Sequence, residues 1–86
     1  MDHVDHLNPM PLYLQLANIL RGMIESGELP SRAPLPSESY LQQQHQVSRG
    51  TVRTAVSILR DEGLVVTIGG RGTFVLPDSA QARQQQ

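Results

Sequence analysis

Apolar and polar positions along the chain follow two different periods, first that of a helix and later that of a strand. Between residues 11 and 26 the apolar positions recur every three to four residues, which predicts an amphipathic helix. Pro11 suits the first helical turn and Gly27 suits the position just past the end, so these residues bound the helix. Its apolar face consists of Leu12, Leu16, Ile19, Leu20, Met23 and Ile24.

A proline-rich connector separates this helix from a second, shorter one. Residues 28–36 contain three prolines and predict turns. Ser37 is predicted to cap the second helix, because a serine hydroxyl accepts hydrogen bonds from the free N–H groups of a first turn. Glu38 in that turn favours the helix dipole. The helix runs to about His45, with Leu41 as its main inward-facing residue.

The third predicted helix runs from Ser48 to about Glu62 and has an apolar side and an arginine side. Ser48 is its N-cap and Gly63 its C-terminal stop. Arg49 and Arg53 lie four residues apart, so they share one face of the helix. The apolar stripe, spaced as a buried helix face requires, consists of Val52, Ala55, Val56 and Leu59.

After Gly63 the pattern changes to that of a β-hairpin. Residues 64–68 are rich in β-branched side chains and predict a strand, residues 71–76 predict the returning strand, and Gly69-Gly70 predicts a tight turn between them. A two-stranded ribbon is marginal alone, so it must pack on the helices. The compact arrangement of these elements is a winged helix-turn-helix, a mainly α fold with a small β-hairpin.

The pattern divides the chain into three parts. Residues 1–10 are predicted as a flexible lead-in and residues 11–76 as the winged helix-turn-helix domain. Residues 77–86 are rich in glutamine and predict a disordered tail.

Composition narrows the class of function. A chain of 86 residues without cysteine holds one small domain, without disulfides, thiolate metal sites or a cysteine nucleophile. It contains no membrane-spanning apolar run and no signal-peptide pattern, so we expect a cytoplasmic location. His3, His6 and His45 do not form a convincing metal set, and no nucleophile–base pair stands at a usable spacing. We therefore expect no metal, no cofactor and no enzymatic activity.

The charge is distributed unevenly. The net charge of −1 argues against general affinity for nucleic acid. Residues 1–38 carry two arginines against five acidic residues, whereas residues 39–76 carry four arginines against two. The basic surplus therefore lies in the half that contains the third helix, which favours nucleic-acid recognition by that helix. Arg60 extends the arginine face, but we expect it to pair with Asp61 or Glu62, or to lie on the surface.

Several short segments resemble the GntR family of bacterial transcription regulators. They occur in the family's order and spacing over about residues 10–76. The resemblance implies a winged helix-turn-helix that binds operator DNA as a dimer. It also implies a second domain that binds a small-molecule effector, which this chain is too short to contain. Residues 77–86 would then start a linker to that missing effector domain. The chain is either a fragment of a longer regulator or a small stand-alone member, and the absence of a clear stop signal in the tail favours the fragment. The segments are residues 11–16, 24–29, 35–38, 47–53, 62–65 and 70–75.

The candidate DNA-binding residues follow from the helix geometry and from the resemblance. The resemblance implies that Arg49 and Arg53 contact bases or phosphates and that the wing tip approaches the minor groove or the backbone. An arginine can donate two hydrogen bonds to a guanine, and the first turn of a helix favours a phosphate. Two copies reading half-sites about one helical turn apart imply a palindromic operator. The full candidate set is Ser37, Ser48, Arg49, Gly50, Thr51, Arg53, Thr54, Ser57, Gly69, Gly70 and Arg71.

The sequence departs from the family at positions that often carry contacts. Ser39 stands where many relatives have an arginine, Thr67 and Ile68 stand where many have basic residues, and Gly50 stands where a side chain is usual. Each departure removes a possible contact. The leading hypothesis is a DNA-binding transcriptional repressor. The alternative is a winged-helix protein–protein interaction module without direct DNA readout.

Overall fold

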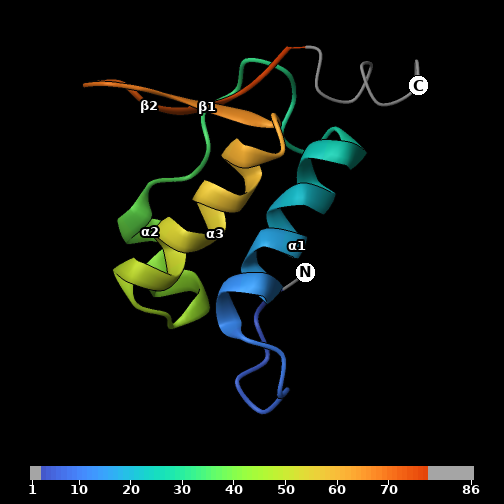
Figure 1. Cartoon of the computed structure of the whole chain (residues 1–86), viewed down its shortest axis with the longest axis vertical. Coiled ribbons are helices and arrows are strands. Elements are labelled where there is room, and N and C mark those ends of the chain that lie inside the picture. Colours follow the sequence, from blue (N-terminus) through green and yellow to red (C-terminus); the bar gives the residue numbers. More distant parts are fainter. Residues whose placement is uncertain (1–2, 78–86) are drawn as a thin grey trace.

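Three helices and one antiparallel hairpin make up residues 3–77, the part of the chain that the computed structural model describes (Figure 1). The predicted order of helix, helix, turn, helix and hairpin is confirmed, and the fold is a winged helix-turn-helix. The elements are α1 (Leu12–Ser26), α2 (Glu38–His45), α3 (Arg49–Asp61), β1 (Val65–Ile68) and β2 (Gly72–Val75). Residues 78–86, predicted as a disordered tail, lie outside the described residues.

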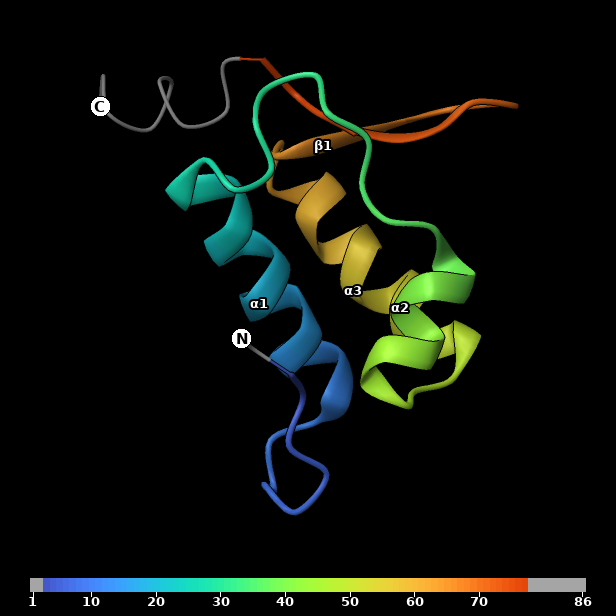
Figure 2. The same cartoon turned by 180° about the vertical axis from the view of Figure 1, so that it is seen from behind.

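The helices form one layer and the hairpin closes one end of it. Figures 1 and 2 both show α1 and α3 side by side, with α2 beside the N-terminal end of α3. The hairpin lies across the other end, where α3 runs into β1. None of the helices within residues 3–77 is both long enough and apolar enough to cross a bilayer.

Local signals at the helix ends fix where the helices start and stop. The Ser37 hydroxyl accepts from the backbone N–H of Tyr40 at 3.1 Å, and the Ser48 hydroxyl accepts from that of Thr51 at 3.0 Å. Gly27 follows α1 with a φ of 88°, a left-handed conformation that glycine adopts without steric cost. The predicted N-caps of α2 and α3, Ser37 and Ser48, are therefore confirmed.

Every element contributes to a single hydrophobic core. The predicted apolar side of α3 is buried at Val52, Ala55 and Leu59, while Val56 is half-buried. Leu41 is the buried apolar residue of α2, as predicted. The largest fully buried side chains are Leu16, Leu20, Val52, Leu59, Leu64 and Val65.

The turn of the wing differs from the prediction. β2 begins at Gly72, which pairs with Ile68, so three residues connect the strands and Arg71 belongs to the turn. The backbone N–H of Arg71 donates to the carbonyl of Ile68 at 3.0 Å. Gly70, one position earlier, has a φ of 78°, which glycine supplies most readily. The prediction of a two-residue turn followed by a strand from residue 71 is therefore wrong.

The proline-rich connector also joins the sheet. The N–H of Arg32 donates to the carbonyl of Val75, the N–H of Val75 donates to the carbonyl of Ala33, and the N–H of Leu35 donates to the carbonyl of Thr73, each at 2.9 Å. Composition predicted only turns here, because prolines lack an N–H donor. The non-proline residues between them nevertheless bond to the open edge of β2, and this gives the wing a third backbone neighbour.

The segment before α1, predicted as a flexible lead-in, makes specific contacts with two helices. Val4 is 8% exposed and belongs to the core, and its N–H donates to Nδ1 of His45 at 3.3 Å. Nε2 of His6 lies 2.9 Å from the carbonyl oxygen of His45. The side-chain oxygen of Gln15 accepts from the N–H of Asp5 at 2.7 Å. These contacts attach the segment to both α1 and α2.

Candidate nucleic-acid interface

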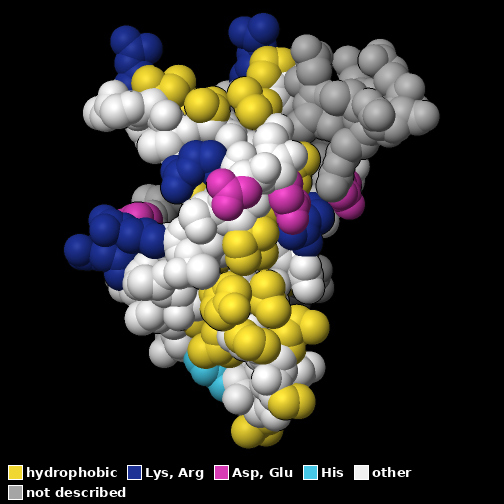
Figure 3. Space-filling model, in the orientation of Figure 1, with side chains coloured by type: hydrophobic (Ala, Val, Ile, Leu, Met, Phe, Trp, Pro, Cys, Tyr) yellow, Lys and Arg dark blue, Asp and Glu magenta, His cyan; other side chains and the backbone are white. Residues whose placement is uncertain are grey.

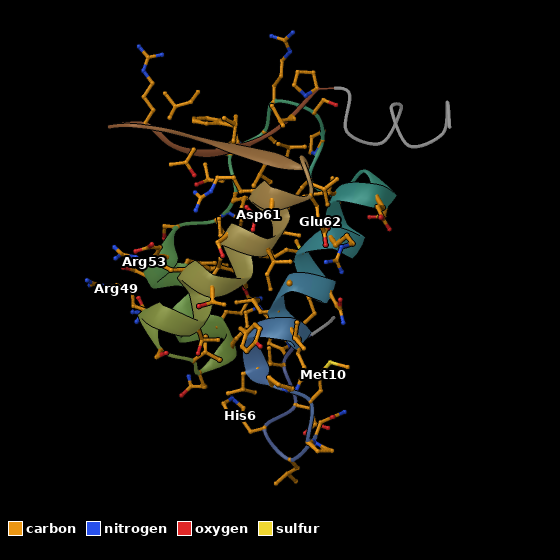
Figure 4. The ribbon with its side chains drawn as sticks, in the orientation of Figure 1. His6, Met10, Arg49, Arg53, Asp61 and Glu62 are labelled. Atoms are coloured by element: carbon orange, nitrogen blue, oxygen red, sulfur yellow. The ribbon has the colours of Figure 1, made fainter. Side chains whose placement is uncertain are left out.

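The exposed side of α3 carries arginines. Arg49 and Arg53 are exposed and lie opposite the buried stripe of the helix. Figure 4 shows both side chains at the outer edge of the molecule, directed away from α1. Helical geometry and one-sided burial therefore produce the division between an apolar and an arginine side that the sequence predicts.

Three of the candidate hydroxyl groups on α3 and at its N-cap are already hydrogen-bonded locally. The Ser48 hydroxyl, besides capping the helix, donates to Oγ1 of Thr51 at 3.0 Å. The Ser57 hydroxyl donates to the carbonyl of Thr54 at 2.8 Å. Gly50 contributes bare backbone on the exposed surface. Among these candidates, Ser48, Thr51 and Ser57 thus serve the helix first, and a ligand contact would be an additional role.

Arg53 is held by an acidic residue of α2, which the sequence did not predict. Its Nε donates to Oε2 of Glu38 at 2.8 Å and its Nη2 to Oε1 at 3.4 Å. The hydrogen bond lowers the pKa of Glu38 and raises that of Arg53. Both side chains are exposed, at 62% for Arg53 and 44% for Glu38. Exposed ion pairs contribute little stability, so Arg53 can exchange Glu38 for another anion at little cost.

A groove of about 700 Å³ separates α3 from the wing. It brings together three of the predicted regions: Ser37 at the start of α2, Arg53 on α3, and the turn from Gly69 to Arg71. The other candidates lie outside this groove, on the N-terminal half of α3 and at Ser57. The candidate set therefore forms a helix face and a wing with a groove between them.

Arg60 connects the two sides of this groove. It is exposed, as predicted, but its Nη1 donates to Oγ1 of Thr67 in β1 at 2.6 Å. Oγ1 of Thr67 lies 3.0 Å from Oγ1 of Thr73 in β2. Glu62, one of its two predicted partners, instead binds Arg21 of α1 at 2.7 Å. Sequence proximity suggested the wrong partner because the fold brings β1 back over the end of α3.

Basic side chains occur on several parts of the surface. Figure 3 shows them beside α2 and α3 and on the wing, and also on the right of this view, where acidic side chains lie next to them. All of these cations are arginines, because the sequence has no lysine. The modest charge asymmetry read from the sequence thus corresponds to a surface that spans the helix and the wing.

His45 is buried and faces away from this surface. It is 4% exposed, and its ring centroid lies 5.4 Å from that of His3. Burial lowers the pKa of His45, and the neighbouring His3 lowers it further. Among the described residues 3–77, no group of three or more His, Asp or Glu side chains could hold a metal ion.

Comparison with known families identifies this arrangement. The family model for bacterial regulatory proteins of the gntR family matches residues 12–75. The chain belongs to the GntR family. Its predicted assignment to that family is confirmed, and the match includes all three helices and both strands of this GntR chain.

Relatives of this GntR chain include named repressors that are considerably longer. It is 43% identical over 83 residues to the HTH-type transcriptional repressor NagR of Bacillus subtilis (strain 168), covering 95% of this chain and 34% of NagR. It is 45% identical over 65 residues to the mannosyl-D-glycerate transport/metabolism system repressor MngR of Escherichia coli (strain K12), covering 76% of this chain and 27% of MngR. The chain thus spans 34% and 27% of these two relatives.

Solved structures of similar chains share the fold. AraR(DBD) in complex with operator ORX1 superposes with a TM-score of 0.80 at 31% identity, covering 87% of this chain and 95% of that one. A GntR family transcriptional regulator from Listeria monocytogenes superposes with a TM-score of 0.84 at 20% identity, covering 95% of this chain and 72% of that one. The second likeness concerns the fold alone.

Proposed function

We propose that this GntR-family chain binds double-stranded operator DNA through α3 and the wing and represses transcription. The observation that carries the proposal is the exposed arginine face of α3, with Arg49 and Arg53, set across a groove from Arg71 at the wing tip. The likeness to AraR(DBD), a chain solved with its operator, supports DNA binding by this fold. So do the names of NagR and MngR, both called repressors.

The proposed contacts follow from the chemistry of each part. α3 enters the major groove, where Arg49 or Arg53 donates two hydrogen bonds to O6 and N7 of a guanine. The first-turn N–H groups that Ser48 leaves unbonded face a phosphate, which the helix dipole favours. Arg71 reaches the backbone or a narrow minor groove. Arg53 releases Glu38 as it engages the DNA, because its exposed ion pair exchanges easily.

The assembly on DNA is part of the proposal. Two copies bind as a homodimer to a palindromic operator, with half-sites about one helical turn apart. The site of action is the bacterial cytoplasm. A small-molecule effector is proposed only for a longer form of the protein that has a further domain. NagR and MngR are long enough to contain such a domain.

The test is a fluorescence-anisotropy titration against palindromic DNA selected from a random pool. The logarithm of the binding constant is expected to fall linearly with the logarithm of the salt concentration. The double variant Arg49→Ala plus Arg53→Ala should abolish specific binding, since each bidentate base contact is worth about 1–3 kcal/mol. The matched control is Arg21→Ala in α1. It removes one positive charge, as Arg49→Ala or Arg53→Ala alone does, and should retain specific binding. Specific binding that survives the double substitution would favour the protein–protein interaction module instead.

A further inference from the structure

The outer half of the wing has little beneath it. Each strand has four residues, and only Val65 of β1 is buried, while Val66, Thr67 and Ile68 are exposed. Figure 1 shows the hairpin projecting past the side of α3. The connector bonds to β2 as far as Thr73, and beyond that point the hairpin is two-stranded and marginal, so the position of its tip relative to α3 needs a specific contact.

Arg60 supplies that contact. Thr67 and Thr73 are directly opposite each other in the hairpin, one pair before the turn. Their hydroxyl oxygens lie 3.0 Å apart, on the side of the sheet that faces the groove. Nη1 of Arg60 donates to Oγ1 of Thr67 at 2.6 Å, so one hydrogen-bonded chain runs from the last turn of α3 through both strands of the wing.

We propose that Arg60 is a positioning residue that fixes the wing relative to α3, so that Arg71 and the arginine face of α3 engage the same DNA segment together. This inference rests on the proposed DNA binding and assigns to Arg60 a role other than phosphate contact. A rigid wing needs no ordering when it binds, and this saves the entropy that a loose wing would lose.

Substitution of Thr67 separates the positioning role from a phosphate contact. Thr67→Val keeps the β-branched shape of an exposed strand residue and every charge on the surface, but it removes the acceptor for Arg60. If Arg60 simply neutralised a phosphate, this change would leave it free to do so and affinity would hold or rise. If Arg60 positions the wing, affinity falls although no cation has been lost.

The first measurement is the dissociation constant for operator DNA at one fixed salt concentration. We expect Arg60→Gln and Thr67→Val each to weaken binding by about fivefold to tenfold, the equivalent of one ordinary intramolecular hydrogen bond. The double variant Arg60→Gln plus Thr67→Val should bind DNA no more weakly than the more affected of the two single variants, because both changes break the same link. Arg71→Ala should then cost less in the Thr67→Val background than in the wild type. Arg32→Gln is the charge-matched control and should retain wild-type affinity to within about twofold.

The second measurement concerns the free protein. Because the sequence has no cysteine, spin labels at Gln43→Cys in α2 and Gly69→Cys in the turn report the distance between the helices and the wing tip. We expect a wider distance distribution in Thr67→Val than in the labelled parent, with the melting temperature of the domain nearly unchanged. A merely structural role would lower the melting temperature without separating the wing from α3.

The outcomes are distinct. Suppose that the wild type binds operator DNA and that Thr67→Val changes neither the affinity nor the width of the distance distribution. This result would overturn the positioning role of Arg60 and leave the proposed function intact. A fall in affinity for Arg60→Gln alone, with a reduced salt slope, would assign Arg60 to a phosphate and also overturn it. Failure of the wild-type domain to bind any selected DNA would overturn both proposals, even if the distance width showed that Arg60 holds the wing.

Discussion

Protonation of one buried side chain should make the stability of the domain depend on pH. His45 is the only buried polar side chain among the described residues, and its Nδ1 accepts a hydrogen bond from the N–H of Val4. A protonated imidazole cannot accept at that nitrogen. Burial lowers the pKa of His45, and His3, whose ring lies 5.4 Å away, lowers it further. His6, on the same segment, contacts His45 through the backbone carbonyl and not through the ring nitrogen that accepts from Val4.

The sign and the size of the effect follow from proton linkage. The pKa of His45 is lower in the folded protein than the ordinary value of 6.5, so the unfolded chain binds the proton more readily. The contribution of neutral His45 to stability is therefore complete above pH 6.5 and is lost as the pH falls through that value towards the folded pKa. One proton gives a slope of at most about 1.4 kcal/mol per pH unit. In a domain of this size, 1 kcal/mol corresponds to a shift of about 4–8 °C in melting temperature.

Urea denaturation at about pH 7.5, 6.5 and 5.5 measures this slope across the range in which an ordinary histidine titrates. The free energy of unfolding of the wild type should fall with pH below about 6.5. His45→Gln should be less stable at the highest pH and nearly independent of pH, while His6→Gln should keep the wild-type slope. Equal slopes in His45→Gln and in the wild type would refute the reasoning, because the proton would then bind elsewhere.

Three further predictions concern packing, charge and backbone in α3. Leu59→Ala should lower the free energy of unfolding by about 2–5 kcal/mol in urea denaturation, because Leu59 is fully buried; a smaller loss would show that the core closes around the gap. Arg53→Ala should weaken operator binding more than Arg49→Ala in anisotropy titrations, because it leaves the carboxylate of Glu38 uncompensated on the interface, and adding Glu38→Gln should restore part of the loss. Gly50→Ala should raise the free energy of unfolding by up to about 1 kcal/mol and weaken DNA binding; tighter binding would count against close approach of the DNA.

The sequence predicted well those features that depend on neighbouring residues. Ser37 and Ser48 cap helices because the N–H groups they accept from belong to residues three positions later. The buried stripe of α3 follows from the helical period, and Gly27 ends α1 because its left-handed backbone is inexpensive. Each of these signals depends on residues within one or two helical turns of one another, so a local pattern in the sequence is enough to predict it.

The features that sequence analysis missed depend on contacts between distant segments. Glu38 and Arg53 are 15 residues apart and meet only because α2 crosses beside α3. Sequence analysis placed His45 only at the approximate end of the second helix, yet it is buried and accepts a hydrogen bond from the N–H of Val4, 41 residues earlier. The connector bonds to β2 only once the hairpin has packed on the helices. No local period encodes such partners, and polar side chains such as these have several acceptable alternatives until the fold selects one.

The fold does not explain why α3 has a glycine in its first turn. A Cβ at Gly50 would meet only Oγ of Ser48, at 3.8 Å, which is ordinary van der Waals contact, and the backbone there has no positive φ. Glycine costs roughly 1 kcal/mol relative to alanine inside a helix, so internal packing gives no reason to keep it. The Ser48 hydroxyl beside it is already engaged by Thr51, which leaves unbonded backbone N–H groups as the local donors. A bare backbone at the positive end of a helix dipole benefits only a group that approaches from outside, and a DNA phosphate has the charge that this end attracts. The weakest helix former of α3 is thus placed where the proposed DNA backbone would come closest.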